Sequence, residues 1–430
     1  MIKRLLPAFV LTLILATTTV GLELHPRFKL NISERFRMVS WDNAITLDKN
    51  ADASRAFTRH RTRISGTWQP LDKLEIGFGL ANEFRYYFTP NNTHLNLDEV
   101  FIDPLYIKWS HVANSPATLT VGRQNIILGE GFIVMDGHPL DGSRSIYFNA
   151  VRLDVALADD HKVTAFYSYQ PKIDDWLPVA HDRDQELVEQ PEQGLGLYYM
   201  GKSGRNDIDG YLLVKNLRQT ASRPKSHIYT LGTKINRPFG RKFLASLEGA
   251  YQFGDYDSID RAAYGLHTHV DYTPRNKTAR FCLPSKMTAG AIVLSGDNPG
   301  TDTFNDWDPG FARWPKWSES YIYTQVFEDA VAYWTNLISL YGRLHFDLDD
   351  GVGFNLDYYH LMADHRATIG QAFPGGDGTT RGKLVIGKLN YRFSKYWSGH
   401  ILWEYFEPGD YYFENADSYG WLRLELMFRI

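Results

Sequence analysis

Apolar and polar residues alternate with a period of two in many segments of the chain, which predicts β-strands with one apolar and one polar face. The last ten residues, 421–430, follow this pattern most strictly. Their apolar face carries Leu422, Leu424, Leu426, Phe428 and Ile430, and their polar face carries Arg423, Glu425 and Arg429. Outer-membrane barrels commonly end in such a strand, because the final strand must close the sheet against the first and shield the backbone from lipid.

Further strands of this kind are predicted along the whole chain. The clearest candidates are residues 28–38, 73–88, 105–109, 117–121, 151–157, 163–169, 243–253, 338–348, 352–358, 385–393 and 397–406. Weaker candidates are residues 58–68, 195–199, 208–214, 227–235, 264–272 and 287–293. Together with the closing strand they number about eighteen, an even count that suits a barrel with a water-filled lumen.

Short and long connections alternate between these strands. The short ones contain the Gly, Pro and Asp residues of tight turns, at residues 69–72, 158–160, 238–241 and 349–351. The long ones are residues 41–56, 125–145, 170–193, 295–333 and 361–380. Outer-membrane barrels have short periplasmic turns and long extracellular loops. The predicted fold class is therefore all-β, a transmembrane antiparallel β-barrel; a soluble sandwich or propeller would not explain the alternation.

The start of the chain has the layout of a cleavable secretory signal. Lys3 and Arg4 precede an apolar run over residues 5–16, which is too short for a membrane-spanning helix of ~20 residues. We therefore expect residues 1–21 to be a signal peptide and residues 22–430 to form one barrel domain in the outer membrane of a Gram-negative type cell. Cys282 is the single cysteine, so no internal disulfide is expected.

Composition supports a membrane sheet and argues against some functions. Aromatic residues make up 14% of the chain, and such residues girdle barrels at both membrane interfaces. The formal net charge of −4 is too small to indicate nucleic-acid binding. The sequence has no Gly-x-Ser-x-Gly, His-Glu-x-x-His or phosphate-binding glycine motif, so we expect no catalytic residue and no cofactor. A barrel enzyme with a serine and a histidine on neighbouring strands is the enzymatic alternative.

Several short motifs resemble the alginate-export family of outer-membrane barrels. They are Val121-Gly122-Arg123-Gln124, Leu128-Gly129-Glu130-Gly131, Arg144, Asn149-Ala150-Val151-Arg152, Leu294-Ser295-Gly296-Asp297 and Glu407-Pro408-Gly409-Asp410. The resemblance spans nearly the whole chain after the signal. It implies an eighteen-stranded monomeric barrel with an arginine-rich lumen, through which an anionic uronate polysaccharide leaves the cell.

Basic side chains recur on the inward faces of the predicted strands, where they would concentrate anions and hold carboxylates in two-pronged contacts. The candidate pore-lining residues are Arg35, Arg37, Arg61, Arg63, Arg85, Lys108, Arg123, Arg144 and Arg152, and Arg59 faces the same way. Alternatively, these residues neutralise lumenal acids at Glu75, Glu83, Asp154, Glu248, Asp271, Asp347, Asp357 and Glu404.

Two further features could add chemistry. The aromatic segment at residues 304–323 could fold inward as a plug or stack on a sugar, although a surface loop packed on its own aromatics is the favoured prediction. His267 and His269 would share one side of a strand and could chelate a metal with Asp271. A polar lumen lining explains this pair more simply, so no metal site is expected.

The main functional hypothesis is a passive outer-membrane channel that exports an alginate-like anionic polysaccharide or oligosaccharide. The alternative is a general or anion-selective porin for the uptake of small solutes. The expected partners are outer-membrane lipid and the transported anion. The sequence leaves open which polymer passes and whether periplasmic secretion partners take part.

Overall fold

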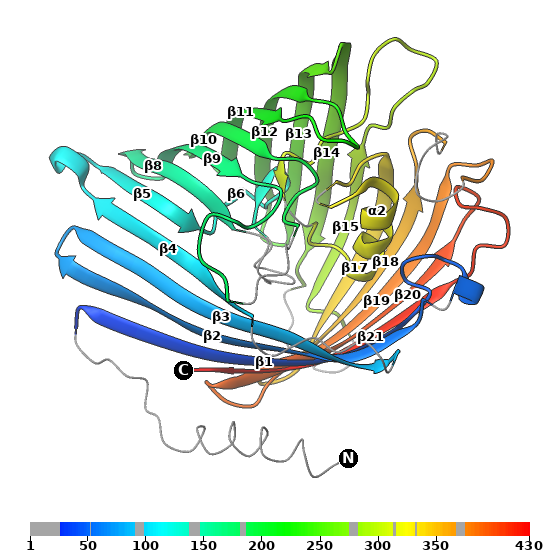
Figure 1. Ribbon diagram of the computed structural model, residues 1–430, viewed down its shortest axis with the longest axis horizontal. Helices are drawn as coiled ribbons and strands as arrows, with labels where there is room; N and C mark the ends of the chain where they lie inside the picture. The colour runs from blue at the N-terminus through cyan, green and yellow to red at the C-terminus, as the bar shows by residue number, and fades with distance from the viewer. Residues whose placement is uncertain are drawn as a thin grey trace.

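A single antiparallel sheet of eighteen strands closes into a barrel in the computed structural model (Figure 1). The structure describes residues 26–51, 53–90, 99–136, 147–180, 186–274, 283–312, 315–331, 333–366 and 375–430. The predicted signal peptide and Cys282 lie outside these residues. The barrel closes because the last strand, β21 (Tyr419–Arg429), pairs with the first, β1 (Phe28–Asp42). The predicted fold class is confirmed, including the closing role of the terminal strand.

Sixteen further strands complete the wall, each paired with its neighbours along the chain. In chain order they are β2 (Arg55–Leu71), β3 (Leu74–Thr89), β4 (Val100–Ser110), β5 (Ala117–Gln124), β8 (Phe148–Ala158), β9 (His161–Gln170), β10 (Glu192–Ser203), β11 (Asn206–Leu217), β12 (Ser226–Phe239), β13 (Phe243–Tyr256), β14 (Ile259–Tyr272), β15 (Lys286–Leu294), β17 (Leu337–Asp349), β18 (Val352–Met362), β19 (Thr380–Arg392) and β20 (Trp397–Pro408).

The remaining elements are short. Three strands, β6 (Ile127–Leu128), β7 (Val134–Met135) and β16 (Phe311–Ala312), form a small second sheet. The helical elements are the 3-10 turns η2 (Lys49–Ala51) and η3 (Val112–Asn114) and the α-helix α2 (Ser320–Asp329), which lies inside the barrel in Figure 1. Within the described residues, no helix is both long and apolar enough to cross a membrane.

The wall has an apolar outer face and a polar inner face, as the period-two pattern predicts. On β12, for example, Leu231 is 60% exposed whereas its neighbour Thr230 is 3% exposed. On β21, Leu422 and Leu424 point outward while Arg423 and Glu425 are buried inside. The exposed apolar side chains form the surface that contacts lipid hydrocarbon.

The alternation of short turns and long loops is confirmed, with two exceptions. Tight connections at residues 72–73, 159–160, 240–242 and 350–351 lie on one rim, and the long connections at residues 43–54, 295–336 and 363–379 lie on the other. However, β13 and β14 are joined at residues 257–258 by a tight turn on the long-loop rim. The thirteen residues 273–285 then join β14 to β15 on the short-turn rim. Turn length therefore marks the rims reliably everywhere except around β14.

Replacing Leu231 by arginine should destabilise the barrel in a bilayer. A charged side chain on the lipid face near the membrane midplane costs about 2–4 kcal/mol, because lipid cannot solvate it. The free energy of unfolding, measured by reversible guanidinium titration in phospholipid vesicles, should fall by this amount.

A matched arginine on the inner face provides the control. Asn31 lies on the lumenal side of β1, opposite Ser65, and is exposed. Asn31→Arg should leave the free energy of unfolding nearly unchanged, because the introduced charge meets water. Equal destabilisation by Leu231→Arg and Asn31→Arg would contradict the assignment of the two faces.

Candidate functional site

Arginines from three neighbouring strands gather on the inner wall and form what we call the basic cluster. Its members are Arg35 and Arg37 on β1, Arg59, Arg61 and Arg63 on β2, and Arg85 on β3. The antiparallel register places Arg35 beside Arg61, and Arg59 between Arg37 and Arg85. The structure thus brings together five of the nine predicted pore-lining residues, and Arg59 is the sixth member of the cluster.

Carboxylates lie within the basic cluster and orient it. Glu83 on β3 forms ion pairs with Arg59 and, at 3.7 Å, with Arg35. Glu425 on β21 accepts a hydrogen bond from Arg37 Nε at 2.6 Å. Asp103 on β4 lies 2.6 Å from Arg63 Nη2. In the described part of the chain, these ion pairs join four of the six guanidinium groups to three carboxylates, so part of the basic cluster follows the internal-pairing alternative.

Arg123 on β5 lies apart from the basic cluster and has a structural role. Its Nη2 and Nη1 donate to the two carboxylate oxygens of Asp174 at 2.7 and 3.3 Å, and its guanidinium stacks 3.8 Å from the ring centroid of Tyr147. Both Arg123 and Asp174 are buried. This two-pronged contact fixes the connection between β9 and β10 against the wall. It is an internal ion pair, but its acid, Asp174, is not among the acids that the internal-pairing alternative lists.

The other predicted pore-lining residues lie further round the wall. Arg152 on β8 contacts Asp154 at 2.8 Å, and Lys108 on β4 lies 3.9 Å from Glu75. Both are more exposed than the basic cluster. Arg144 lies outside the described residues. The candidate path therefore consists of one dense cluster and two separate, partly exposed cations.

The long connection between β15 and β17, residues 295–336, folds into the lumen, and we call it the inward segment. Trp307 is fully buried and packs over Gly265 on β14, where an added Cβ would meet the indole at 2.7 Å. Within the same segment, β16 pairs with β7 in the small lumenal sheet. The favoured prediction of a surface loop at residues 304–323 is therefore wrong for its described part, because its aromatic side chains pack against the barrel wall. Trp307 packs over Gly265, Trp317 packs against Tyr359, and Tyr321 packs against Phe406.

The beginning of α2 is held by an acid on the wall. Glu404 on β20 is buried and accepts hydrogen bonds from the Ser318 hydroxyl at 2.6 Å, from the Ser320 hydroxyl, and from the backbone N–H groups of Glu319 and Ser320 at 3.3 and 3.4 Å. The carboxylate accepts hydrogen bonds from N–H groups that have no partner within the helix. Its negative charge is also stabilised by the positive end of the helix dipole. Glu319 in turn pairs with Arg423 on β21.

The end of α2 is held by Arg381 on β19, which is fully buried. Its Nη1 donates to Glu328 Oε2 at 2.7 Å and to the Tyr321 hydroxyl at 3.0 Å. Its Nε donates to the backbone carbonyl of Asn336 at 3.1 Å. Burial raises the pKa of the Tyr321 hydroxyl, so the phenol remains protonated at neutral pH. One arginine therefore ties both the helix and the return of the inward segment to the wall.

Other polar groups fix the inward segment near its start. Asp308 accepts a hydrogen bond from Lys215 on β11 at 2.8 Å. Burial raises the pKa of Asp306 to about 6, although its Oδ1 accepts a hydrogen bond from the backbone N–H of Asp297 at 2.8 Å. The segment is thus anchored to several strands around the lumen, and its helix lies inside the barrel.

Arg381 and Glu328 were not among the predicted site residues. The predicted strand at residues 385–393 begins too late to include Arg381, which lies at a bulge where Met362 pairs with Thr380 but Leu361 pairs with Gly382. A bulge places two successive residues on one face, so Arg381 and Gly382 both point inward. A prediction that assumes strict alternation of inward and outward residues cannot find a residue at a bulge.

Solved structures of outer-membrane proteins share this fold, whereas no family model and no curated protein sequence matches the chain. OccK11 (OpdR) of Pseudomonas aeruginosa aligns with a TM-score of 0.58 at 11% identity, over 94% of this chain and 96% of that chain. OpdK with vanillate, from the same organism, gives 0.56 at 10% identity, over 93% and 98%. OccK2 (OpdF) in complex with glucuronate, also from P. aeruginosa, gives 0.55 at 11% identity, over 94% and 96%.

The fold is that of an outer-membrane β-barrel, and a closed barrel with an apolar outer face belongs in the outer membrane of a Gram-negative type cell. At these identities the likeness concerns the fold alone. It supports an outer-membrane β-barrel and does not support the alginate-export family specifically.

Proposed function

We propose that the protein is a passive porin through which small carboxylate-bearing solutes enter the cell. The observation that carries this proposal is the basic cluster, with its guanidinium groups on three adjacent strands of the inner wall. Glucuronate and vanillate, which accompany two of the structural neighbours, are both small carboxylates. A wall rich in guanidinium groups suits this class of solute because each group can contact two oxygens of one carboxylate.

The basic cluster would act as a series of weak sites. A guanidinium has five N–H donors, so one arginine can contact a wall carboxylate and a carboxylate solute at the same time. The wall carboxylates also limit how tightly that anion is held. Conduction needs binding that is strong enough to admit the solute and weak enough to release it. The mixed charge of the cluster meets both requirements.

The inward segment favours small solutes over a polymer. Its aromatic residues and α2 occupy lumenal space that a wide chain would need, and Arg381 and Glu404 anchor it to the wall. Export of a uronate polymer relies on the same carboxylate chemistry but also requires a wider passage. These contacts, together with the structural neighbours, support small-solute uptake better than export.

Planar-bilayer recordings test the proposal. Under a potassium chloride gradient, the zero-current potential should show anion preference, because the basic cluster concentrates chloride. Glucuronate or vanillate should reduce the chloride current in a concentration-dependent way, while glucose at the same concentration should not. Oligouronates of increasing length should permeate progressively less in liposome-swelling assays. Cation preference, or equal effects of glucose and glucuronate, would refute the proposal.

A further inference from the structure

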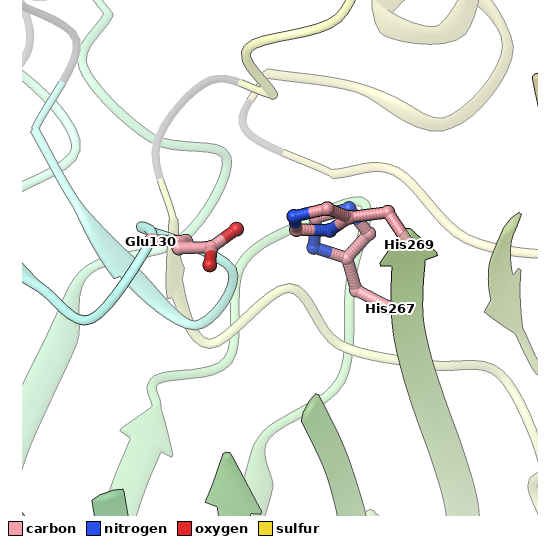
Figure 2. A group of neighbouring side chains, drawn as sticks. All are labelled: Glu130, His267 and His269. Carbon is pink, nitrogen blue, oxygen red and sulfur yellow. The ribbon is translucent and has the colours of Figure 1, made fainter. Parts of the chain in front are cut away.

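The side chains of two histidines on the wall and one glutamate from a lumenal turn lie close together. His267 and His269 project inward from β14, and Glu130 lies in the turn between β6 and β7 (Figure 2). One ligand atom from each residue lies within 4.8 Å of the other two. The imidazole centroids are 5.3 Å apart, and the glutamate carboxylate faces them. The sequence pairs these histidines with Asp271, whereas the folded chain supplies Glu130 as the third potential ligand.

The surroundings of the two imidazoles match those of metal ligands. His267 Nε2 lies 3.0 Å from the Tyr341 hydroxyl on β17, and His269 Nε2 lies 3.8 Å from Asp271 Oδ2. Metal-binding histidines usually contact an oxygen through the ring nitrogen that does not bind the metal. This arrangement assigns Nδ1 of each ring to the ligand position. Among the described residues, His269 Nδ1 is buried and has no hydrogen-bond partner, which is costly unless another group satisfies it.

The glutamate can also act as a ligand. Its Oε1 forms an ion pair with the Lys234 ammonium at 3.3 Å and accepts a hydrogen bond from the Ser246 hydroxyl at 3.3 Å. Both contacts use Oε1, so a cation could take Oε2 without displacing either. The Lys234 ammonium beside Oε1 stabilises the negatively charged carboxylate. Lys234 also lies 4.0 Å from Asp209, which gives the ammonium a second acidic partner.

We propose that Glu130, His267 and His269 bind a divalent transition-metal cation of the Zn²⁺ type. Two imidazoles and one carboxylate form a common ligand set for zinc, with water in the fourth position. Tetrahedral coordination places ligand atoms about 3.3 Å apart, so side-chain rotations that shorten the observed separations would complete the site. The bound cation would pin the β6–β7 turn to β14 and add positive charge to the lumen. This inference does not depend on which solute the channel carries.

Isothermal titration of the purified full-length protein with zinc chloride tests the site. The parent should bind one Zn²⁺ per chain, and Co²⁺ should give the visible absorption of a tetrahedral nitrogen and oxygen site. His267→Gln and His269→Gln should each weaken zinc binding at least ~10-fold, since even changes around metal ligands have effects of this size. Lys234→Gln should strengthen binding, because it removes a neighbouring positive charge.

His345 provides the matched control. It lies on the inner face of β17, 2.7 Å from Asn355 and 3.1 Å from Asp347. It therefore has a carboxylate contact, but among the described residues it belongs to no group of potential metal ligands. His345→Gln should bind zinc like the parent. Heat-modifiable gel migration will verify that each variant forms the barrel. The proposal is overturned if the folded parent binds no zinc, or if the double His267→Gln, His269→Gln variant binds it with parental affinity.

Discussion

Replacing Arg381 by methionine should release the end of α2 from the wall and raise the single-channel conductance several-fold. The guanidinium is fully buried and contacts Glu328, Tyr321 and the backbone of Asn336. Removing one partner of a buried ion pair costs about 3–5 kcal/mol, because the remaining charge is left uncompensated. The inward segment can avoid this cost by moving Glu328 into the water-filled lumen. Planar-bilayer recordings should show larger and noisier currents.

A double variant separates loss of the ion pair from loss of packing. Arg381→Met combined with Glu328→Met removes both charges, and apolar replacement of a whole buried pair is often neutral. The double variant should therefore return towards the parental conductance. Glu328 takes no part in the backbone pairing of the wall strands. All variants should therefore keep the heat-modifiable migration of a closed barrel. Parental conductance in the single variant would show that this pair does not hold the segment.

The wall of the barrel could be predicted from sequence because its physics is local. A strand between lipid and water must alternate in polarity, and all eighteen predicted strands correspond to strands of the wall. Inward residues such as Arg35, Arg61 and Glu83 follow from the same alternation. Their grouping follows from the up-and-down topology, because consecutive strands lie side by side. The prediction fails only where the alternation itself fails, as at the bulge that turns Arg381 inward.

The interior could not be predicted in the same way, because its contacts join distant parts of the chain. Trp307 is seated over Gly265, and Ser318 is held by Glu404 on another strand. An aromatic loop with this composition could equally pack upon itself at the surface. Whether the loop packs inside or outside depends on two features of the wall: a glycine that leaves room for an aromatic ring, and a buried hydrogen-bond acceptor within reach of the loop. Such complementarity becomes visible only when the barrel is closed.

Reversing the charge of Arg61 and Arg85 together should turn the proposed anion preference of the channel into a cation preference. These residues lie on β2 and β3 beside Glu83 and Arg59, respectively, within the basic cluster. Changing each arginine to glutamate alters the local charge by two units. At about 8 Å in a water-like dielectric, such a change is worth about 1 kcal/mol, or about five-fold in the local concentration of a monovalent anion. Two reversals should therefore move the zero-current potential to the side of cation preference.

The graded response makes this prediction specific to the basic cluster. Arg61→Gln with Arg85→Gln removes half as much charge and should give an intermediate zero-current potential. Lys202→Glu is the matched control, because Lys202 lies at the short-turn end of β10, is half exposed and contacts Asp160 outside the cluster. It should leave ion preference unchanged. If the double glutamate variant forms a closed barrel and keeps the parental zero-current potential, permeating ions do not pass the basic cluster. A shift equal to that of Lys202→Glu would instead indicate a general effect of net charge.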